Sequence, residues 1–359
     1  MKRLLFSAAF VAAVGLGTVA AVSQSADPYA NNRPPASQSA DPYANNAAAG
    51  ALKFPMTAPA GVDSKAMEKS LPGAVNAGKF NDKTWKYGPA FNSPPGAKIW
   101  NPVKAKMLKG DKVTGGTLFS SSDPNTYCAL ANAGYDFIWV EHQHFARSWS
   151  DTARMWAQCP HAKAVPGVRV AYTDEREIQT ATDAGALVIV VPTIRSYEEA
   201  VKARDWTFFP PLGKRSQGGG QAFGPSFWGG VPGGYRQTWN DNAVLILMIE
   251  TLDGLQDADR IAKIPGVTAI FAASGDLSNH TGYRQGDPDY ERNINIVHDA
   301  AIKAGIRLCG PLAWRDRPDY TCFQAGSETL AIANGVKADL GPLLNTQGAV
   351  EVGPFAPKK

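Results

Sequence analysis

The chain has 359 residues, of which 44% are hydrophobic, 10% aromatic and 19% charged, and its formal net charge is +4. This composition excludes a wholly disordered chain, because enough apolar side chains are present to bury a large core. The small net charge and the lack of a lysine and arginine run give no indication of a nucleic acid partner.

Residues 1–22 have the pattern of a secretory signal peptide. Lys2 and Arg3 precede an apolar stretch at 4–17, and small residues follow at 19–21. The stretch is shorter than the ~20 apolar residues of a membrane-spanning helix, and an uncleaved anchor is the alternative. We therefore expect an exported protein, periplasmic or secreted, with no membrane attachment once the signal is removed.

The sequence after the signal is of low complexity. The decapeptide SQSADPYANN occurs at 23–32 and again at 37–46, which predicts a disordered spacer. Residues 47–97 are rich in Pro, Gly and Ala without sustained periodicity, and we expect an extended arm that lies on the main domain or on a neighbouring subunit. The spacer and arm thus occupy 23–97, before a folded domain at 98–350.

Four cysteines occur, at Cys128, Cys159, Cys309 and Cys322. An even number in an exported chain allows disulfides, with three possible pairings. Their spacings match no zinc-binding pattern. Buried free thiols are the alternative.

From Gly115 onward, short apolar runs alternate with helical patterns. Asp174 is placed as an N-cap with Glu177 three residues later, and Gly305 closes a helix whose apolar positions include Ile294. The eight predicted strands are Gly116–Ser120, Asp136–Val140, Gly167–Val170, Leu187–Val191, Leu245–Ile249, Thr268–Ala272, Ile306–Cys309 and Thr329–Ala333. Eight such repeats predict an α/β fold, a (β/α)₈ TIM barrel.

One connection, Phe208–Asn240, is much longer than the others and is dense in Gly and aromatic residues. Long loops in compact domains are usually functional or mobile. The segment is either a lid over the barrel mouth or an ordered surface excursion that packs its own aromatic side chains.

The second predicted strand ends in four polar residues, Glu141, His142, Gln143 and His144. Barrel enzymes place their chemistry at the C-terminal ends of the strands. Because histidine titrates near neutral pH, His144 or His142 is a candidate general base, and Glu141 is placed to orient the imidazole of His144.

Two further acids follow strands directly. Glu250 comes after VLILMI and Asp276 after TAIFAASG. Neighbouring strands lie ~4.8 Å apart, so both carboxylates can bind one ion, and two oxygen ligands suit Mg²⁺ or Mn²⁺. The alternative is that each carboxylate only caps the helix after its strand.

Arg169 lies within the apolar strand VPGVRVAY. A buried guanidinium needs an anion, because an unpaired buried charge is costly. A substrate carboxylate or keto oxygen would serve, and a structural ion pair with Glu141 or Asp183 is the alternative.

The segments DFIWVEHQH, VRV, DAGA, VP, PPLGKR, MIET and GDLS occur in an order and spacing that resemble the HpcH/HpaI aldolase family, which is grouped with citrate lyase β subunits and macrophomate synthase. The resemblance covers roughly Asn101 to Asn345. It implies a barrel of the phosphoenolpyruvate/pyruvate type, a small-molecule 2-oxo acid and an aldehyde as substrates, and a homo-oligomer, since relatives exchange their C-terminal helices.

The resemblance also implies roles for individual residues. His144 takes the place of the family's base and Glu141 that of its partner acid, and Arg169 matches the family's strand-three arginine. Glu250 and Asp276 match the two metal ligands. The backbone at Ser274, Gly275, Asp276 and Leu277 matches the segment that cradles the substrate carboxylate in relatives.

The chain departs from the family pattern at several positions. Glu141 replaces Asp, Gln143 replaces Glu, Ser216 replaces Gly, and Met248 replaces a Gln; the segment FAASGDLS at 271–278 replaces FIGPADLS. The metal site is intact, and the natural substrate is left open. We expect a class II pyruvate aldolase, with an exported organic-acid-binding barrel or an acyl-CoA lyase of the citrate lyase β type as alternatives.

Overall fold

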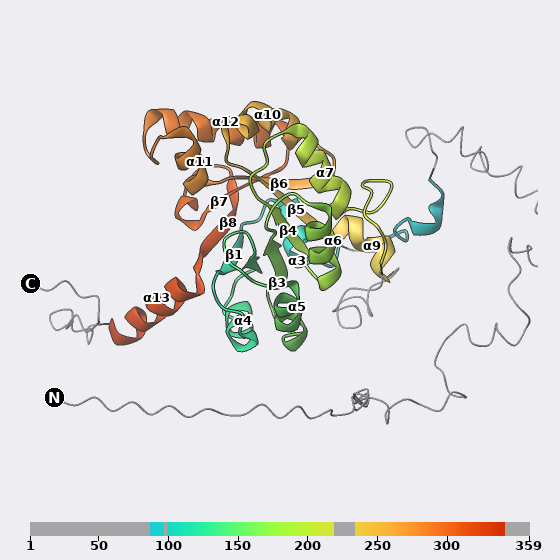
Figure 1. The fold of residues 1–359 in the computed structure, drawn as a ribbon, viewed down its shortest axis with the longest axis horizontal. Helices are drawn as coiled ribbons and strands as arrows, with labels where there is room; N and C mark the ends of the chain where they lie inside the picture. Colours follow the sequence, from blue (N-terminus) through green and yellow to red (C-terminus); the bar gives the residue numbers. More distant parts are fainter. Residues whose placement is uncertain (1–86, 97–98, 219–233, 342–359) are drawn as a thin grey trace, which may run out of the picture. The chain divides into compact units, whose positions relative to one another are not determined.

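The computed structural model describes residues 87–96, 99–218 and 234–341. In this part of the chain eight parallel strands pair in sequence order, and β8 pairs with β1 to close a barrel (Figure 1). The strands are β1 (Val113–Leu118), β2 (Phe137–Glu141), β3 (Val165–Arg169), β4 (Val188–Val191), β5 (Val244–Ile249), β6 (Val267–Ala272), β7 (Arg307–Pro311) and β8 (Tyr320–Ser327). The predicted (β/α)₈ barrel is confirmed.

Helices pack around the barrel and bury the outward faces of the strands, except the last helix, which extends away from the barrel (Figure 1). They are α3 (Pro102–Lys109), α4 (Pro124–Ala131), α5 (Trp149–Gln158), α6 (Glu175–Ala184), α7 (Tyr197–Thr207), α9 (Gly234–Asn242), α10 (Leu252–Ala262), α11 (Ser274–Thr281), α12 (Pro288–Ala304) and α13 (Glu328–Leu340), with short 3-10 turns η4 (Pro89–Phe91) and η5 (Leu312–Trp314). Every residue of β2 to β6 is buried, which explains why these strands are apolar on both faces.

The predicted helix signals are present. The Asp174 carboxylate accepts hydrogen bonds from the N–H groups of Arg176 and Glu177, so Asp174 is the N-cap of α6. Gly305 ends α12 with a φ of 69°, in the left-handed region that glycine enters without strain.

The prediction of the eighth strand is wrong. Thr329–Ala333 lies in α13, and the strand is Tyr320–Ser327. The apolar run reflects an uncovered helix and not a buried strand: within α13 only Glu328 is buried, and the helix extends away from the barrel (Figure 1). Seven other predicted strands overlap the observed ones.

The long connection after α7 leads through α9 directly into the start of β5, at the end of the barrel opposite the C-terminal strand ends. In its described part the aromatic rings of Phe209, Tyr235 and Trp239 surround the guanidinium of Arg215 at 4.6, 5.6 and 4.5 Å. These described residues form an excursion that packs its own aromatic side chains; residues 219–233 lie outside the described part.

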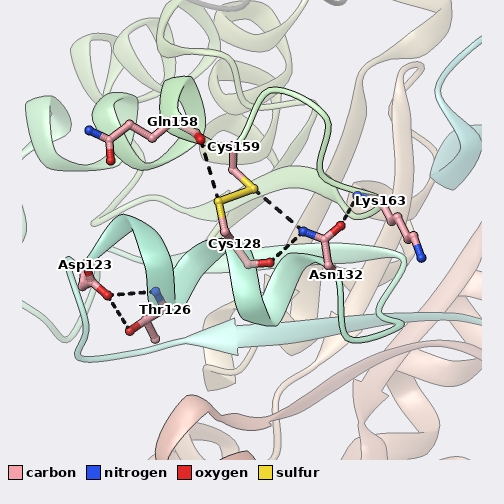
Figure 2. The surroundings of a disulfide bond; sticks show 7 residues. All are labelled: Asp123, Thr126, Cys128, Asn132, Gln158, Cys159 and Lys163. Carbon is pink, nitrogen blue, oxygen red and sulfur yellow. Dashed lines mark hydrogen bonds between the residues drawn. A yellow bond between two sulfur atoms is a disulfide. The ribbon is translucent and has the colours of Figure 1, made fainter.

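One disulfide joins two outer helices. Cys128 on α4 is bonded to Cys159, the residue that follows α5 (Figure 2). Beside it, the Asn132 side chain donates to the Cys128 carbonyl at 2.8 Å and accepts from the Lys163 backbone at 3.3 Å. Cys309 and Cys322 are buried free thiols, so both alternatives for the cysteines occur in the same molecule.

The predicted signal at 1–22 and most of the predicted spacer and arm lie outside the described residues. The described end of the arm lies against α9, where the Ser93 hydroxyl is 2.7 Å from the Gln237 carbonyl oxygen and the Arg236 guanidinium lies 4.5 Å from the Phe91 ring. Among the described helices, none has the length and apolar character needed to cross a membrane.

Candidate active site

A cavity of about 160 Å³ opens at the C-terminal ends of the strands. It is lined by residues that follow or end β3, β5, β6, β7 and β8: Arg169, Met248, Glu250, Phe271, Ala273, Ser274, Gly275, Asp276, Pro311 and Gln324. Five of the predicted site residues are therefore brought together in one pocket.

Arg169 and Glu141 form a buried ion pair at the edge of this cavity. The two residues are Cα partners on neighbouring strands, and the Nε and Nη2 atoms of Arg169 lie 2.7 and 2.5 Å from Glu141 Oε2. Of the two ion-pair partners that the sequence left open for Arg169, Glu141 is the one observed, because Asp183 pairs with Arg215 at 2.5 Å. The pair holds the guanidinium in place, and Arg169 still lines the cavity.

The other oxygen of Glu141 accepts hydrogen bonds from two backbone N–H groups, those of Gln143 at 2.6 Å and His144 at 3.1 Å. In the described part of the chain no hydrogen bond joins the Glu141 carboxylate to the His144 imidazole. Glu141 therefore shapes the turn that carries His144, and its predicted effect on the imidazole stays a prediction.

The two candidate histidines differ in their surroundings. His142 is buried, stacks on Trp149 with ring centroids 4.0 Å apart, and lies 2.8 Å from the Thr152 hydroxyl. Burial, with a contribution from the positive charge of Arg147, lowers the pKa of His142 to about 4. His144 is exposed. His142 is thus a neutral core residue, and His144 remains the candidate base.

Glu250 is fully buried, and its two carboxylate oxygens are used differently. Oε1 accepts hydrogen bonds from the Thr193 N–H at 2.6 Å and the Thr193 hydroxyl at 3.1 Å, whereas Oε2 is buried and has no hydrogen-bond partner among the described residues. Burial raises the pKa of Glu250, and the nearby Asp276 adds to this, while the Thr193 hydrogen bonds oppose it. A buried carboxylate oxygen without a hydrogen-bond donor lowers the stability of the fold unless a cation binds to it.

The alternative function of these acids as helix caps is not observed. The N-cap of α10 is Thr251, whose hydroxyl accepts from Gly254, and the N-cap of α11 is Ala273, which makes no side-chain cap bond. Asp276 instead lies in the first turn of α11 and lines the cavity with Glu250.

Glu250 and Asp276 fit a hard divalent cation. The unpartnered Glu250 oxygen and the carboxylate of Asp276 are the type of ligand that Mg²⁺ and Mn²⁺ prefer. The described residues contain no cluster of three or more His, Cys, Asp and Glu side chains placed to hold a metal. The remaining positions around such an ion would be open to substrate oxygens and water.

The start of α11 supplies the other side of the cavity. Ser274, Gly275 and Asp276 line it, and the first N–H groups of a helix have no partners within the helix and favour anions. Leu277, predicted to contribute through its backbone, is not among the residues that line the cavity, and its side chain is buried in the core. Its predicted contact with substrate stays a prediction.

Sequence reasoning missed Gln324, Pro311 and Thr193. Gln324 lines the cavity from β8, and its amide lies 3.4 Å from the Thr117 hydroxyl. It was missed because the eighth strand was placed too late in the chain. Nothing in the sequence around Thr193 signals its hydrogen bonds to Glu250, which depend on the turn after β4.

The fold and the cavity define a (β/α)₈ barrel enzyme with an acidic pair, an arginine and a helix start at its mouth. Residues 116–340 match the model of the HpcH/HpaI aldolase/citrate lyase family, and the chain belongs to this family. This membership makes the protein a carbon–carbon lyase.

Characterised relatives are aldolases. The chain is 33% identical over 208 residues to a 2-dehydro-3,6-dideoxy-6-sulfogluconate aldolase of Pseudomonas putida, covering 57% of this chain and 80% of that protein. It is 32% identical over 212 residues to a hydroxypyruvate/pyruvate aldolase of Paraburkholderia phytofirmans, covering 57% of this chain and 81% of the relative.

A solved structure shares the barrel. An HpcH/HpaI aldolase/citrate lyase family protein from Burkholderia cenocepacia J2315 superposes with a TM-score of 0.60 at 25% identity, covering 68% of this chain and all of that one. The likeness therefore extends over the whole of the solved chain.

Proposed function

We propose that the protein is a divalent-metal-dependent class II aldolase that cleaves or forms a carbon–carbon bond of a 2-oxo acid through a pyruvate enolate. The observation that carries the proposal is a buried Glu250 oxygen that has no hydrogen-bond partner in the described part of the chain, in the same cavity as Asp276 and Arg169. The named activities of the relatives, which act on pyruvate or 2-keto sugar acids, support the same reaction type.

Each group at the mouth has a part in this reaction. Bound Mg²⁺ or Mn²⁺ would supply polarisation of the carboxylate and keto oxygens of the substrate. Arg169, held by Glu141, presents its guanidinium to the keto oxygen, where negative charge develops as the carbon–carbon bond breaks. The N–H groups at the start of α11 favour the substrate carboxylate.

His144 handles the proton in this scheme. In the cleavage direction its imidazole takes the proton of the aldol hydroxyl, the carbon–carbon bond breaks, and the electron pair moves toward the keto oxygen to give the enolate and an aldehyde. Protonation of the enolate at C3 then yields pyruvate. His144 is exposed three residues after the C-terminal end of β2; it is not among the residues that line the cavity.

The first test is exchange of the pyruvate C3 protons in D₂O, followed by NMR with Mg²⁺ or Mn²⁺ and with EDTA as control. We expect metal-dependent exchange by the wild type, and loss of both exchange and Mn²⁺ binding in Glu250→Gln and in Asp276→Asn. Glu175→Gln, which changes an exposed acid of α6, is the matched control and should keep both. Exchange that persists in EDTA would refute the metal-dependent scheme.

His144→Ala separates proton transfer from metal binding. The variant should bind Mn²⁺ like the wild type and lose cleavage of an aldol substrate. Normal cleavage by this variant would remove the assignment of His144 as the base. Mn²⁺ binding without pyruvate exchange in the wild type would favour an organic-acid-binding protein or an acyl-CoA lyase.

We further propose that the protein works outside the cytoplasm. The signal-like residues 1–22 and the Cys128–Cys159 disulfide support this, since disulfides persist in oxidising compartments. Expression of the full chain in a bacterial host, fractionation and N-terminal sequencing test it. We expect a processed chain in the periplasm or medium; an unprocessed chain in the cytoplasm would contradict the proposal.

A homo-oligomer is the third part of the proposal. Ile332, Val336 and Leu340 repeat every four residues along α13, and their exposed fractions are 61%, 48% and 42%. An apolar stripe of this exposure is unfavourable in water unless another surface covers it. A second copy of the chain is the partner we propose for this stripe.

A further inference from the structure

The turn after β4 holds a residue in an unusual backbone conformation. Thr193 has a φ of 53°, in the left-handed region that β-branched residues rarely enter. Such a conformation persists only when the surrounding structure enforces it, and residues of this kind concentrate at functional sites.

Contacts on both sides of Thr193 enforce its conformation. The N–H of Ile194 donates to the Met248 carbonyl of β5 at 3.1 Å, and the N–H of Arg195 donates to the Glu199 carboxylate at 2.9 Å. The Ile194 carbonyl lies so close to α10 that a Cβ added at Gly254 would be 2.3 Å from its oxygen. Only glycine at position 254 allows this approach.

The strained turn directs two donors at one carboxylate oxygen. The N–H and the hydroxyl of Thr193 both donate to Glu250 Oε1, at 2.6 and 3.1 Å. The hydroxyl oxygen in turn accepts from the Gln143 amide at 3.2 Å, which links the turn to the segment after β2. Because Oε1 is saturated by these donors, Oε2 is the oxygen left available to an ion.

We infer that Thr193 is a positioning residue of the metal site: it locks the Glu250 carboxylate by Oε1 and thereby reserves Oε2 for the divalent cation. The inference rests on the proposed metal-dependent function. The contacts of Ile194 and Arg195, with the close approach at Gly254, hold Thr193 in its strained conformation and so maintain this arrangement.

The test measures Mn²⁺ affinity by the EPR signal of free Mn²⁺, on the full mature chain, with thermal unfolding of the metal-free protein as a check of folding. Thr193→Val removes the hydroxyl and should weaken Mn²⁺ binding about 10- to 100-fold, the usual effect of losing a group that orients a metal ligand. Thr193→Ser keeps both donors and should restore the affinity. Thr207→Val removes a buried hydroxyl that donates to the Ala203 carbonyl within α7 and serves as the matched control.

Two further variants keep the test decisive if Thr193→Val does not fold. Thr193→Gly accepts the left-handed φ and keeps only the backbone donor, so it should bind Mn²⁺ more weakly than Thr193→Ser. Gly254→Ala touches neither carboxylate but displaces the Ile194 carbonyl, and it should also weaken Mn²⁺ binding. For each weakened variant that folds, pyruvate exchange should recover toward the wild-type rate at saturating Mn²⁺.

The outcomes separate this inference from the proposed function. Wild-type Mn²⁺ affinity in both Thr193→Val and Thr193→Gly would overturn the positioning role and leave the metal site standing. Failure of the wild-type protein to bind Mn²⁺ would overturn the metal site itself, and the inference with it.

Discussion

His142 and His144, one residue apart, have opposite surroundings at the end of β2. His142 turns into the space beneath α5, where it stacks on Trp149 and meets the Thr152 hydroxyl. His144 is exposed to solvent, three residues after β2 ends. Burial lowers the pKa of His142, so this side chain serves the fold, whereas the side chain of His144 is accessible to solvent.

The buried His142 makes stability depend on pH. The imidazole of the unfolded chain takes up a proton below a pKa of 6.5, whereas the folded one does so only near 4. The stabilisation is therefore complete above pH 6.5 and is lost as the pH falls toward 4, by about 2 kcal/mol at pH 5. Urea unfolding at pH 7 and pH 5 should show a smaller difference in His142→Phe than in the wild type.

The control for that experiment is His161→Phe, which removes an exposed histidine. It should keep the wild-type difference between the two pH values. An unchanged pH dependence in His142→Phe would show that the acid sensitivity arises elsewhere.

The sequence identified charged residues that lie at or shortly after the C-terminal end of an apolar strand. Arg169 ends β3, Glu250 directly follows β5 and Asp276 lies four residues after β6, and the barrel brings all three into one cavity. The sequence did not identify Thr193, because its contribution comes from a backbone conformation and from two hydrogen bonds that span 57 residues of sequence. The sequence offered Glu141 and Asp183 as ion-pair partners of Arg169 but did not decide between them.

At the scale of elements, the loop after β1 is held by two charged side chains. The Glu328 carboxylate accepts hydrogen bonds from the backbone N–H groups of Phe119, Ser120 and Ser121 at 2.7, 2.7 and 2.9 Å. Arg147 donates to the carbonyl of Ser121 at 2.5 Å and to that of Glu141 at 2.7 Å. One carboxylate and one guanidinium thus provide hydrogen-bond partners for the backbone groups of this loop, which pairs with no strand in the described part of the chain.

Glu328→Gln should loosen this loop. Burial raises the pKa of Glu328, but the donors from Phe119 and Ser120 outweigh it and hold the pKa below its ordinary value, so the charged form is the one that the fold stabilises. Loss of the charge should lower the free energy of unfolding at pH 7 by roughly 1–3 kcal/mol, because three backbone donors would then compete for one amide oxygen.

The measurement is urea unfolding at pH 7, with Glu175→Gln as the control at an exposed first-turn acid, where a change within about 0.5 kcal/mol is expected. Equal stability of both variants would contradict a structural function for Glu328. Since the folded pKa is lowered, this contribution should vanish on acidification below the ordinary carboxyl range.

The same region explains the one strand that sequence reasoning misplaced. β8 mixes Gln324 and Ser327 with apolar residues, because its inward side chains meet a polar cavity near the mouth, and this mixture resembles a loop. The more apolar run a few residues later belongs to the exposed helix α13. An apolar run in the sequence indicates a surface that tends to be buried against another surface. It does not indicate whether that surface belongs to a strand or to a helix.

At the scale of the whole molecule, the exposed apolar stripe of α13 predicts that the chain forms a homo-oligomer. Size-exclusion chromatography with light scattering should give a mass above that of one chain for the wild type. Ile332→Asp and Val336→Asp together should yield monomers, because each places a charge in the apolar stripe. Lys337→Asp, on the same helix but at a polar position, is the control; a monomeric wild type would refute the proposed homo-oligomer.

The Cys128–Cys159 bond determines what a single cut by a protease would do to the chain. The segment it encloses, 31 residues in sequence separation, contains β2, the acid of the ion pair and the candidate base. Its exposed positions include His144 and Ala146. If a peptide bond were cut there, the disulfide would still join the two fragments. The residues on both sides of the cut would then stay in one covalent molecule, and the fragments would separate only after the disulfide was reduced.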